Sequence, residues 1–279
     1  MIDKRDILKL KKITLLGLEK CQKALVEAQG DFEKALHILR KQGEKIAAKR
    51  VGRTMEEGRI FAGLNADKKS GVILALGTET DFAAKSENFK ALGDALVKYA
   101  LEKGCTAAAD LLAASYGQHT FQEEITQIAG GLRENVSLID YQYIQAPVVG
   151  FYVHTGYKLG GMVALNMAEC DGVALAEVAR NFAMQVVISD PFSIDEKDFP
   201  EKELSNEREA IMAKLSKKAL PADKVGPIVE RALAKFVKEN ILVAQIFIQD
   251  EEKTVGEYMA AISSAIQITQ FKRLQIGLL

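Results

Sequence analysis

The 279-residue sequence has no tryptophan, three cysteines, three histidines and five prolines. Its cysteines lie at positions 21, 105 and 170 and form no CxxC pair. This spacing excludes a zinc knuckle and a disulfide scaffold, and it favours a reducing compartment. No apolar run is long enough to cross a membrane. The charged N-terminus is unlike a signal peptide, so we expect a cytoplasmic protein with no membrane partner.

The common catalytic and phosphate-binding motifs are also missing. No two of the 21 glycines flank a single residue, which excludes GxGxxG, and there is no Walker A pattern. HExxH and GxSxG are absent as well. We therefore predict that the protein is not an enzyme, with no catalytic residue, no metal site and no cofactor. An enzyme that uses dispersed carboxylates is the least favoured alternative.

Charge is balanced overall but unevenly distributed. The chain has 37 basic and 38 acidic residues, while residues 1–53 hold 14 basic against 7 acidic ones. The basic residues concentrate in residues 40–53, which read either as a solvated helix and linker or as a docking surface. This segment has no aromatic residue for base stacking, so we expect no direct binding of nucleic acid.

Residues 4–50 predict a small helical module. Apolar residues recur at intervals of three and four at Leu18, Cys21, Leu25 and Ala28. Gly30 is expected to end this helix, Asp31 to cap the next, and Gly43 to end that one. Cys21 is interpreted as a small buried apolar residue.

After residue 58 the same order of elements occurs twice. Strands at 59–62 and 72–76, a loop at 77–82 and a helix capped by Ser86 form the first unit. Strands at 148–153 and 162–165 and a helix at 174–189 form the second. We predict an α+β fold with two related subdomains, each an antiparallel sheet with helices on one face.

The C-terminal third reads as helical and then mixed. Helices at 201–218 and 223–239, with a corner at Leu220 and Pro221, predict an inserted helical hairpin at about 200–240. A strand at 242–248, a capping box from Thr254 to Glu257 and a last strand at 266–274 follow. The predicted domains are 1–53, 54–144 and 145–279.

The most informative segment is the loop that ends in Thr80, Asp81 and Phe82. Phe82 could pack inward and Asp81 could cap the next helix, which are the usual roles of such residues. Alternatively, an aromatic ring beside a carboxylate on a stiff loop could anchor a protein partner.

Several blocks in order resemble bacterial elongation factor Ts, the nucleotide-exchange factor of elongation factor Tu. The blocks are Cys21 to Leu25, Gly30-Asp31, Lys34-Ala35, Leu39-Arg40, Gly43, Ala47 to Lys49, Thr80-Asp81-Phe82 with Ala84-Lys85 and Phe89, Tyr152-Val153-His154, Glu230-Arg231, Lys235-Phe236, Leu242, Gln245, Phe247, and Lys253 to Gly256. The sequence departs from the family pattern at Leu15, Gln22, Arg133, Asp140 and Gln185, where Leu15 and Arg133 replace glycines.

The resemblance implies a ubiquitin-associated-like N-terminal module of three helices and binding to elongation factor Tu, both GDP-bound and nucleotide-free. It also implies that Thr80, Asp81, Phe82 and Ala83 contact the partner and displace its Mg²⁺ and phosphate-loop contacts, so that GDP leaves. Weaker partner contacts are expected at His154, Lys23, Leu132 and Arg133. His154 could instead simply end a strand, with a ring nitrogen bonded to backbone.

A different class of function remains open from the residues. The basic helical module could make the chain a passive adaptor that binds a protein or RNA without remodelling it. A steep dependence of affinity on salt would indicate RNA binding.

Overall fold

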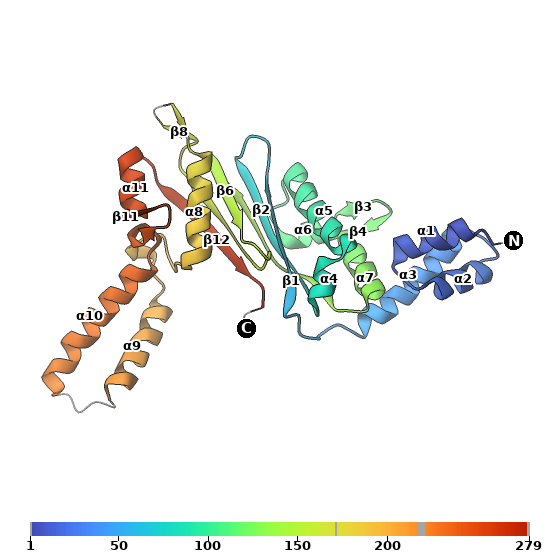
Figure 1. Cartoon of the computed structure of the whole chain (residues 1–279), viewed down its shortest axis with the longest axis horizontal. Coiled ribbons are helices and arrows are strands. Elements are labelled where there is room, and N and C mark those ends of the chain that lie inside the picture. The colour runs from blue at the N-terminus through green and yellow to red at the C-terminus, as the bar shows by residue number, and fades with distance from the viewer. Residues whose placement is uncertain (1, 171, 217–220, 278–279) are drawn as a thin grey trace.

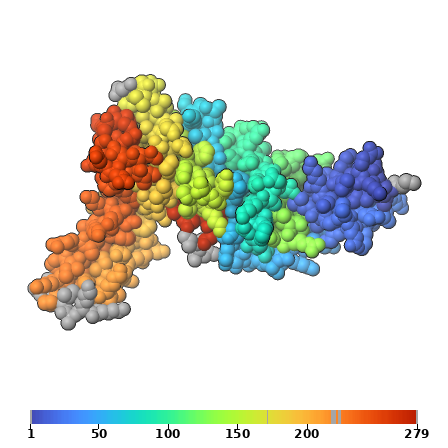
Figure 2. Space-filling view, viewed as in Figure 1, coloured from blue at the N-terminus to red at the C-terminus, as the bar shows by residue number. Residues whose placement is uncertain are grey.

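A computed structural model describes residues 2–170, 172–216 and 221–277 of the chain. Figure 1 shows an elongated molecule with a helical module at the N-terminal end, two sheets with flanking helices in the middle, and a projecting pair of helices. Figure 2 shows the same projection as a separate arm in the space-filling view. The predicted α+β class is confirmed.

The N-terminal module consists of α1 (Lys4–Thr14), α2 (Leu18–Glu27) and α3 (Phe32–Ala48). Asp31 caps α3 as predicted, because its carboxylate accepts a hydrogen bond from the Lys34 backbone N–H at 3.0 Å. Cys21 is fully buried in the module core, and this burial raises the pKa of its thiol. The interpretation of Cys21 as a core residue is therefore confirmed.

The expectation that Gly43 ends the third helix is wrong. Helix α3 runs through Gly43, because a glycine inside a helix weakens it without having to end it. At this point α7 (Phe121–Leu132) crosses α3, and a Cβ atom built on Gly130 of α7 would lie 2.4 Å from the Gly43 carbonyl oxygen. Gly130 thus allows the module to pack closely against the central part of the molecule.

Replacing Gly130 by alanine should loosen this packing. The new methyl group would overlap backbone that cannot move independently, so we expect the free energy of unfolding to fall by about 1–3 kcal/mol. Gly43→Ala is the matched control, because its Cβ would meet only the Gln127 side-chain oxygen, at 3.4 Å. Urea unfolding of both variants measures the difference, and an equal loss in both would contradict the close crossing.

The first sheet has the order β1-β2-β5 and is antiparallel. It contains β1 (Glu57–Leu64), β2 (Ser70–Thr78) and β5 (Val136–Gln145). Every residue of β2 is buried, since one face packs on helices and the other on the second sheet. The covering helices are α5 (Glu87–Lys103), α6 (Ala108–Ala113) and α7. β3 (Ser115–Tyr116) and β4 (His119–Thr120) are short strands of two residues each.

The second sheet has the antiparallel order β12-β7-β6. It contains β6 (Val148–Val153), β7 (Leu159–Leu165) and β12 (Ile268–Gln275), covered on its outer face by α8 (Ala176–Ser189) and α11 (Val255–Ile262). The short strands β8 (Glu169–Cys170) and β9 (Val173–Ala174) form a separate hairpin.

The inner faces of the two sheets share one apolar core, which gives four layers in the order helix, sheet, sheet, helix. Its buried members are Ile60, Ile73, Ala75, Ile144, Val149, Met162, Ala164, Leu274 and Ile276. Two antiparallel sheets with helices on one face each were predicted, and they are present. The domain boundaries stay a prediction.

The projecting arm is formed by α9 (Glu201–Leu215) and α10 (Ala222–Asn240) (Figure 1). Ile211, Val229 and Leu233 form its small core. The predicted end of the first helix at residue 218 and the corner residue Leu220 lie outside the described residues. Among the described residues, no helix is both long and apolar enough to span a membrane.

The predicted strand at 242–248 is largely wrong. Leu242–Ala244 form a 3-10 helix, and only Ile246–Phe247 form a strand, β10, which pairs with β11 (Asp250–Thr254). Leu242 and Phe247 are both fully buried, and five residues apart in a straight strand they would face opposite sides. The turn between them therefore brings both side chains into one core. The capping box of Thr254 and Glu257 is confirmed.

Candidate functional site

The Thr80–Ala83 segment follows the buried strand β2 and runs into a short helix, α4 (Asp81–Lys85). The Thr80 hydroxyl oxygen caps this helix by accepting a hydrogen bond from the Ala83 N–H at 3.3 Å. Asp81 and Phe82 were expected in a loop and instead begin the helix. Ser86 ends α4 and caps α5, so the segment is held by regular structure on both sides.

The Phe82 side chain points into solvent. It is 83% exposed, whereas Ala83 and Ala84, which follow it, are buried against the core. Phenylalanine is among the residues most often buried, so a ring this exposed needs a reason. The alternative in which Phe82 packs inward is wrong, and the ring is free to contact another molecule.

Asp81 is ionised beside this ring. Its carboxylate forms an ion pair with Lys85 Nζ at 2.6 Å, and this hydrogen bond lowers the pKa of Asp81. The residue therefore carries its charge at neutral pH. The alternative in which Asp81 caps the helix is wrong, because Thr80 supplies the cap.

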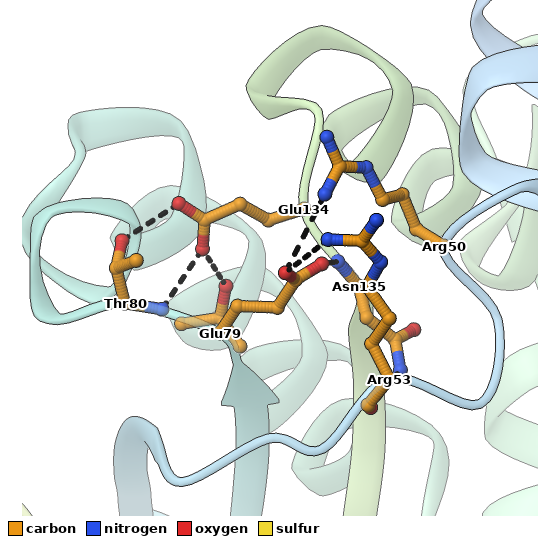
Figure 3. A network of polar contacts seen from close by, with 7 residues as sticks. Arg50, Arg53, Glu79, Thr80, Glu134 and Asn135 are labelled. Carbon is orange, nitrogen blue, oxygen red and sulfur yellow. Dashed lines mark hydrogen bonds and ion pairs between the residues drawn. The ribbon is translucent and has the colours of Figure 1, made fainter.

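Glu134 clamps the start of the Thr80–Ala83 segment (Figure 3). One carboxylate oxygen accepts hydrogen bonds from the Thr78 hydroxyl and from the Thr80 N–H, both at 2.9 Å. The other accepts one from the Thr80 hydroxyl at 2.6 Å. Hydrogen bonds to a charged acceptor are among the stronger ones in proteins, so the base of the segment has little freedom.

The Glu79 side chain points toward Asn135, Arg50 and Arg53 (Figure 3). One of its carboxylate oxygens accepts a hydrogen bond from the Asn135 N–H at 2.7 Å. The other lies 3.6 Å from Arg50 and 3.4 Å from Arg53. The Asn135 side-chain amide donates to the Arg53 carbonyl oxygen at 2.9 Å. Two arginines of the basic segment 40–53 thus tie the end of the helical module to this site.

The other predicted contact residues are placed less uniformly. Leu132 and Arg133 end α7, directly before Glu134, so they lie near the Thr80–Ala83 segment. Leu132 packs partly buried against the core, and Arg133 is exposed. His154 follows β6, and its Nδ1 lies 3.1 Å from the Tyr152 hydroxyl rather than bonding to backbone. Lys23 is on α2 in the distant module, paired with Glu19 at 2.6 Å.

Leu15 and Arg133, which replace glycines of the family pattern, both adopt the left-handed backbone conformation, with φ of 58° and 61°. Glycine is favoured at such helix C-caps because it has no Cβ to strain. The sequence therefore departs from the pattern where glycine has a conformational role.

Arg133→Gly should relieve strain at the end of α7. We expect the free energy of unfolding to rise by up to about 1 kcal/mol, measured by urea or thermal unfolding. Arg133→Ala is the control, since it removes the same side chain but keeps the strain. If Arg133 contacts a partner, both variants should weaken that binding. A stability gain in alanine equal to that in glycine would contradict the strain.

Glu134, Glu79 and Asn135 were not predicted as site residues. The sequence shows Glu134-Asn135 far from Thr80, and only the fold brings them together. Within the described ranges, no group of three or more His, Cys, Asp or Glu side chains is placed to hold a metal ion. What the arrangement offers to solvent is the Phe82 ring beside the charged Asp81.

The family model and the relatives that match this sequence all belong to one family. The model of the family described as Elongation factor TS matches residues 79–278. Elongation factor Ts of Amoebophilus asiaticus is 37% identical over 276 residues, covering 99% of this chain and 99% of the relative. Elongation factor Ts of Prosthecochloris aestuarii is 34% identical over 286 aligned positions, with 99% of each chain covered.

A third relative, elongation factor Ts of Christiangramia forsetii, is 32% identical over 272 residues, covering 98% of this chain and 97% of the relative. The family model begins at residue 79, and the relatives extend the match over the helical module. The chain therefore belongs to the elongation factor Ts family.

Proposed function

We propose that this protein binds GDP-bound elongation factor Tu and accelerates the release of GDP, with the Phe82 ring inserted beside the nucleotide site of the partner. The observation that carries the proposal is an 83% exposed phenylalanine on a helix whose N-cap residue, Thr80, is clamped by Glu134. Membership of a family of nucleotide-exchange factors supplies the partner. Release needs no bond making or breaking by this chain, so the proposed role is not enzymatic.

The geometry suits such a task because the aromatic ring is held in place before binding. A loop that orders on contact spends part of its interaction free energy on that ordering. Here the Thr80 cap and the Glu134 hydrogen bonds have already fixed the backbone that carries Phe82. The free energy of contact can then go into moving groups of the partner.

A GTPase holds GDP through backbone amides around the phosphates and through Mg²⁺. In the proposed complex the ring displaces the elements that bear these contacts, and the ionised Asp81 approaches the Mg²⁺ region. Ala83 supports the helix behind the ring. Linkage is reciprocal: if this chain lowers the affinity of elongation factor Tu for GDP by some factor, GDP must lower the affinity of elongation factor Tu for this chain by the same factor. The chain changes the rate of exchange and not its final equilibrium.

Passive binding of RNA by the basic segment is less well supported. Arg50 and Arg53 are engaged with Glu79. We propose that the partner is elongation factor Tu, GDP-bound or nucleotide-free, with no direct role for nucleic acid or membrane, in the cytoplasm. A steep log–log dependence of RNA affinity on salt would instead favour the adaptor.

The function is tested by mixing the protein with elongation factor Tu loaded with fluorescent GDP and an excess of unlabelled GDP. Stopped-flow fluorescence should show faster release as this chain is added, saturating at high concentration. Release that stays at the intrinsic rate, although a complex forms in size-exclusion chromatography, would support the passive adaptor.

A further inference from the structure

A pocket with several charged lining residues lies beside the Thr80–Ala83 segment. It has a volume of about 680 Å³, large enough for a side chain of another protein. Its walls come from the start of β1, from α4 and α5, and from the turn between β6 and β7. The lining residues are Glu57, Gly58, Arg59, Asp81, Ala84, Lys85, Lys90, Thr155, Gly156, Tyr157 and Lys158. We call it the Arg59 pocket.

The pocket has an excess of positive charge. Four of its residues are basic and two are acidic. Lys85 is paired with Asp81 at 2.6 Å and Lys158 with Glu57 at 2.7 Å. These two pairs use both carboxylates of the lining. Lys90 is paired at 2.7 Å with Glu87, which does not line the pocket.

Arg59 is the cation without a carboxylate. Within the residues that the structure describes, no acidic side chain lies within ion-pair distance of it, and its buried Nε has no hydrogen-bond partner. Its guanidinium carbon lies 3.4 Å from the centroid of the Tyr157 ring, and it is also near the Phe61 ring. A half-buried arginine normally finds an acidic partner, because burial without one costs free energy.

The turn that carries Tyr157 is attached to β1. The Ile60 N–H donates to the Tyr157 carbonyl oxygen at 2.7 Å, which joins the turn to β1. Tyr157 itself has a φ of 62°, a backbone conformation that is costly for a bulky residue. Stacking on Arg59 fixes the planar guanidinium, so its outer N–H groups are oriented before any ligand arrives.

The pocket is continuous with the proposed contact surface. Asp81 and Lys85 of α4 line it, and Phe82 projects from the same helical turn. A partner that covers Phe82 must therefore also lie over or beside the opening of the pocket.

We propose that the Arg59 pocket receives an acidic side chain of elongation factor Tu, whose carboxylate pairs with the Arg59 guanidinium, with the Lys90–Glu87 pair at the rim. The inference rests on the proposed function and adds to it a second anchor, which contributes affinity, next to the Phe82 ring, which displaces GDP. Fixed planar guanidinium groups favour carboxylates, which they bind through two parallel hydrogen bonds.

Arg59→Gln tests the proposal. We expect the Kd for elongation factor Tu·GDP to rise about tenfold or more, because the carboxylate of the partner would lose its charged counterpart. The difference should shrink at high salt. Release of GDP at saturating concentrations of the variant should stay near the wild-type rate, because Phe82 and its clamp are intact. Arg59→Lys should lose less affinity.

Lys90→Glu provides a second variant that does not touch the Tyr157 stacking. It should weaken binding several-fold by placing a negative charge at the rim. Lys98→Glu is its matched control, since Lys98 is on the same helix, is exposed, and does not line the pocket. Circular dichroism verifies that each variant is folded. If Arg59→Gln does not fold, the affinity of Lys90→Glu decides whether the pocket contributes to binding.

The outcomes separate the two proposals. If the wild-type chain fails to accelerate GDP release, the proposed function is wrong. If the wild type is active but Arg59→Gln or a folded Lys90→Glu binds as tightly as the wild type, only the pocket assignment is overturned. Arg59-dependent binding of inorganic phosphate by the isolated chain, with unchanged affinity for elongation factor Tu, would also overturn it in favour of a free-anion site.

Discussion

Replacing Phe82 by alanine is expected to slow GDP release at saturating concentrations of the factor by at least about 30-fold, the effect of losing roughly 2 kcal/mol at an aromatic hot spot. The ring is 83% exposed, so its removal takes nothing from the core. The free energy of unfolding should change by less than about 0.5 kcal/mol. Stopped-flow release of fluorescent GDP measures the rate.

Met212→Ala is a suitable control for Phe82→Ala. Met212 is a large apolar residue, 47% exposed, on the projecting arm far from α4 (Figure 1). It should leave the stimulated rate unchanged. Phe82→Leu should retain part of the activity, because a smaller apolar side chain still fills part of the space. Wild-type rates in Phe82→Ala would mean that another element displaces GDP.

Glu134→Ala should produce the second largest effect, without Glu134 touching the partner's nucleotide. The substitution removes the acceptors of three hydrogen bonds and leaves the fully buried Thr78 hydroxyl unpaired. We expect the free energy of unfolding to fall by about 1–3 kcal/mol. The stimulated GDP release should slow about tenfold or more, because the start of α4, the helix that carries Phe82, is no longer fixed.

A structural role alone would predict a loss of stability without a loss of rate. Thr120→Ala is the control, because it removes the cap at the far end of α7 and should cost about 1 kcal/mol of stability while leaving the Glu134 hydrogen bonds in place. Both variants are measured at a temperature where they are fully folded. Normal release by Glu134→Ala under these conditions would show that the clamp does not position Phe82.

Much of the architecture follows from local sequence patterns. The apolar run of β2, the Ser86 cap and the capping box at Thr254 each predict their element correctly, because hydrophobic period and capping act over a few residues. Strand β5 and helix α7 were not predicted. β5 has a register shift against β2 and mixes an exposed apolar residue, Ile139, with buried residues, so its alternation is broken.

The errors come from tertiary contacts. Gly43 is read as a helix end in isolation, whereas in the fold α3 continues through it to the crossing with α7, where Gly130 has no room for a Cβ atom. The same holds for the site. The segment from Thr80 to Phe82 stands out in the sequence, whereas Glu134 and Glu79 acquire their roles through hydrogen bonds between residues more than fifty positions apart.

The most direct measurement of the central claim is the equilibrium affinity of elongation factor Tu for GDP with and without saturating amounts of this chain, for the wild type and for Phe82→Ala. We predict that the wild type weakens GDP binding strongly, and that Phe82→Ala still forms the complex but weakens GDP binding much less. Equal weakening of GDP binding by both proteins would contradict it.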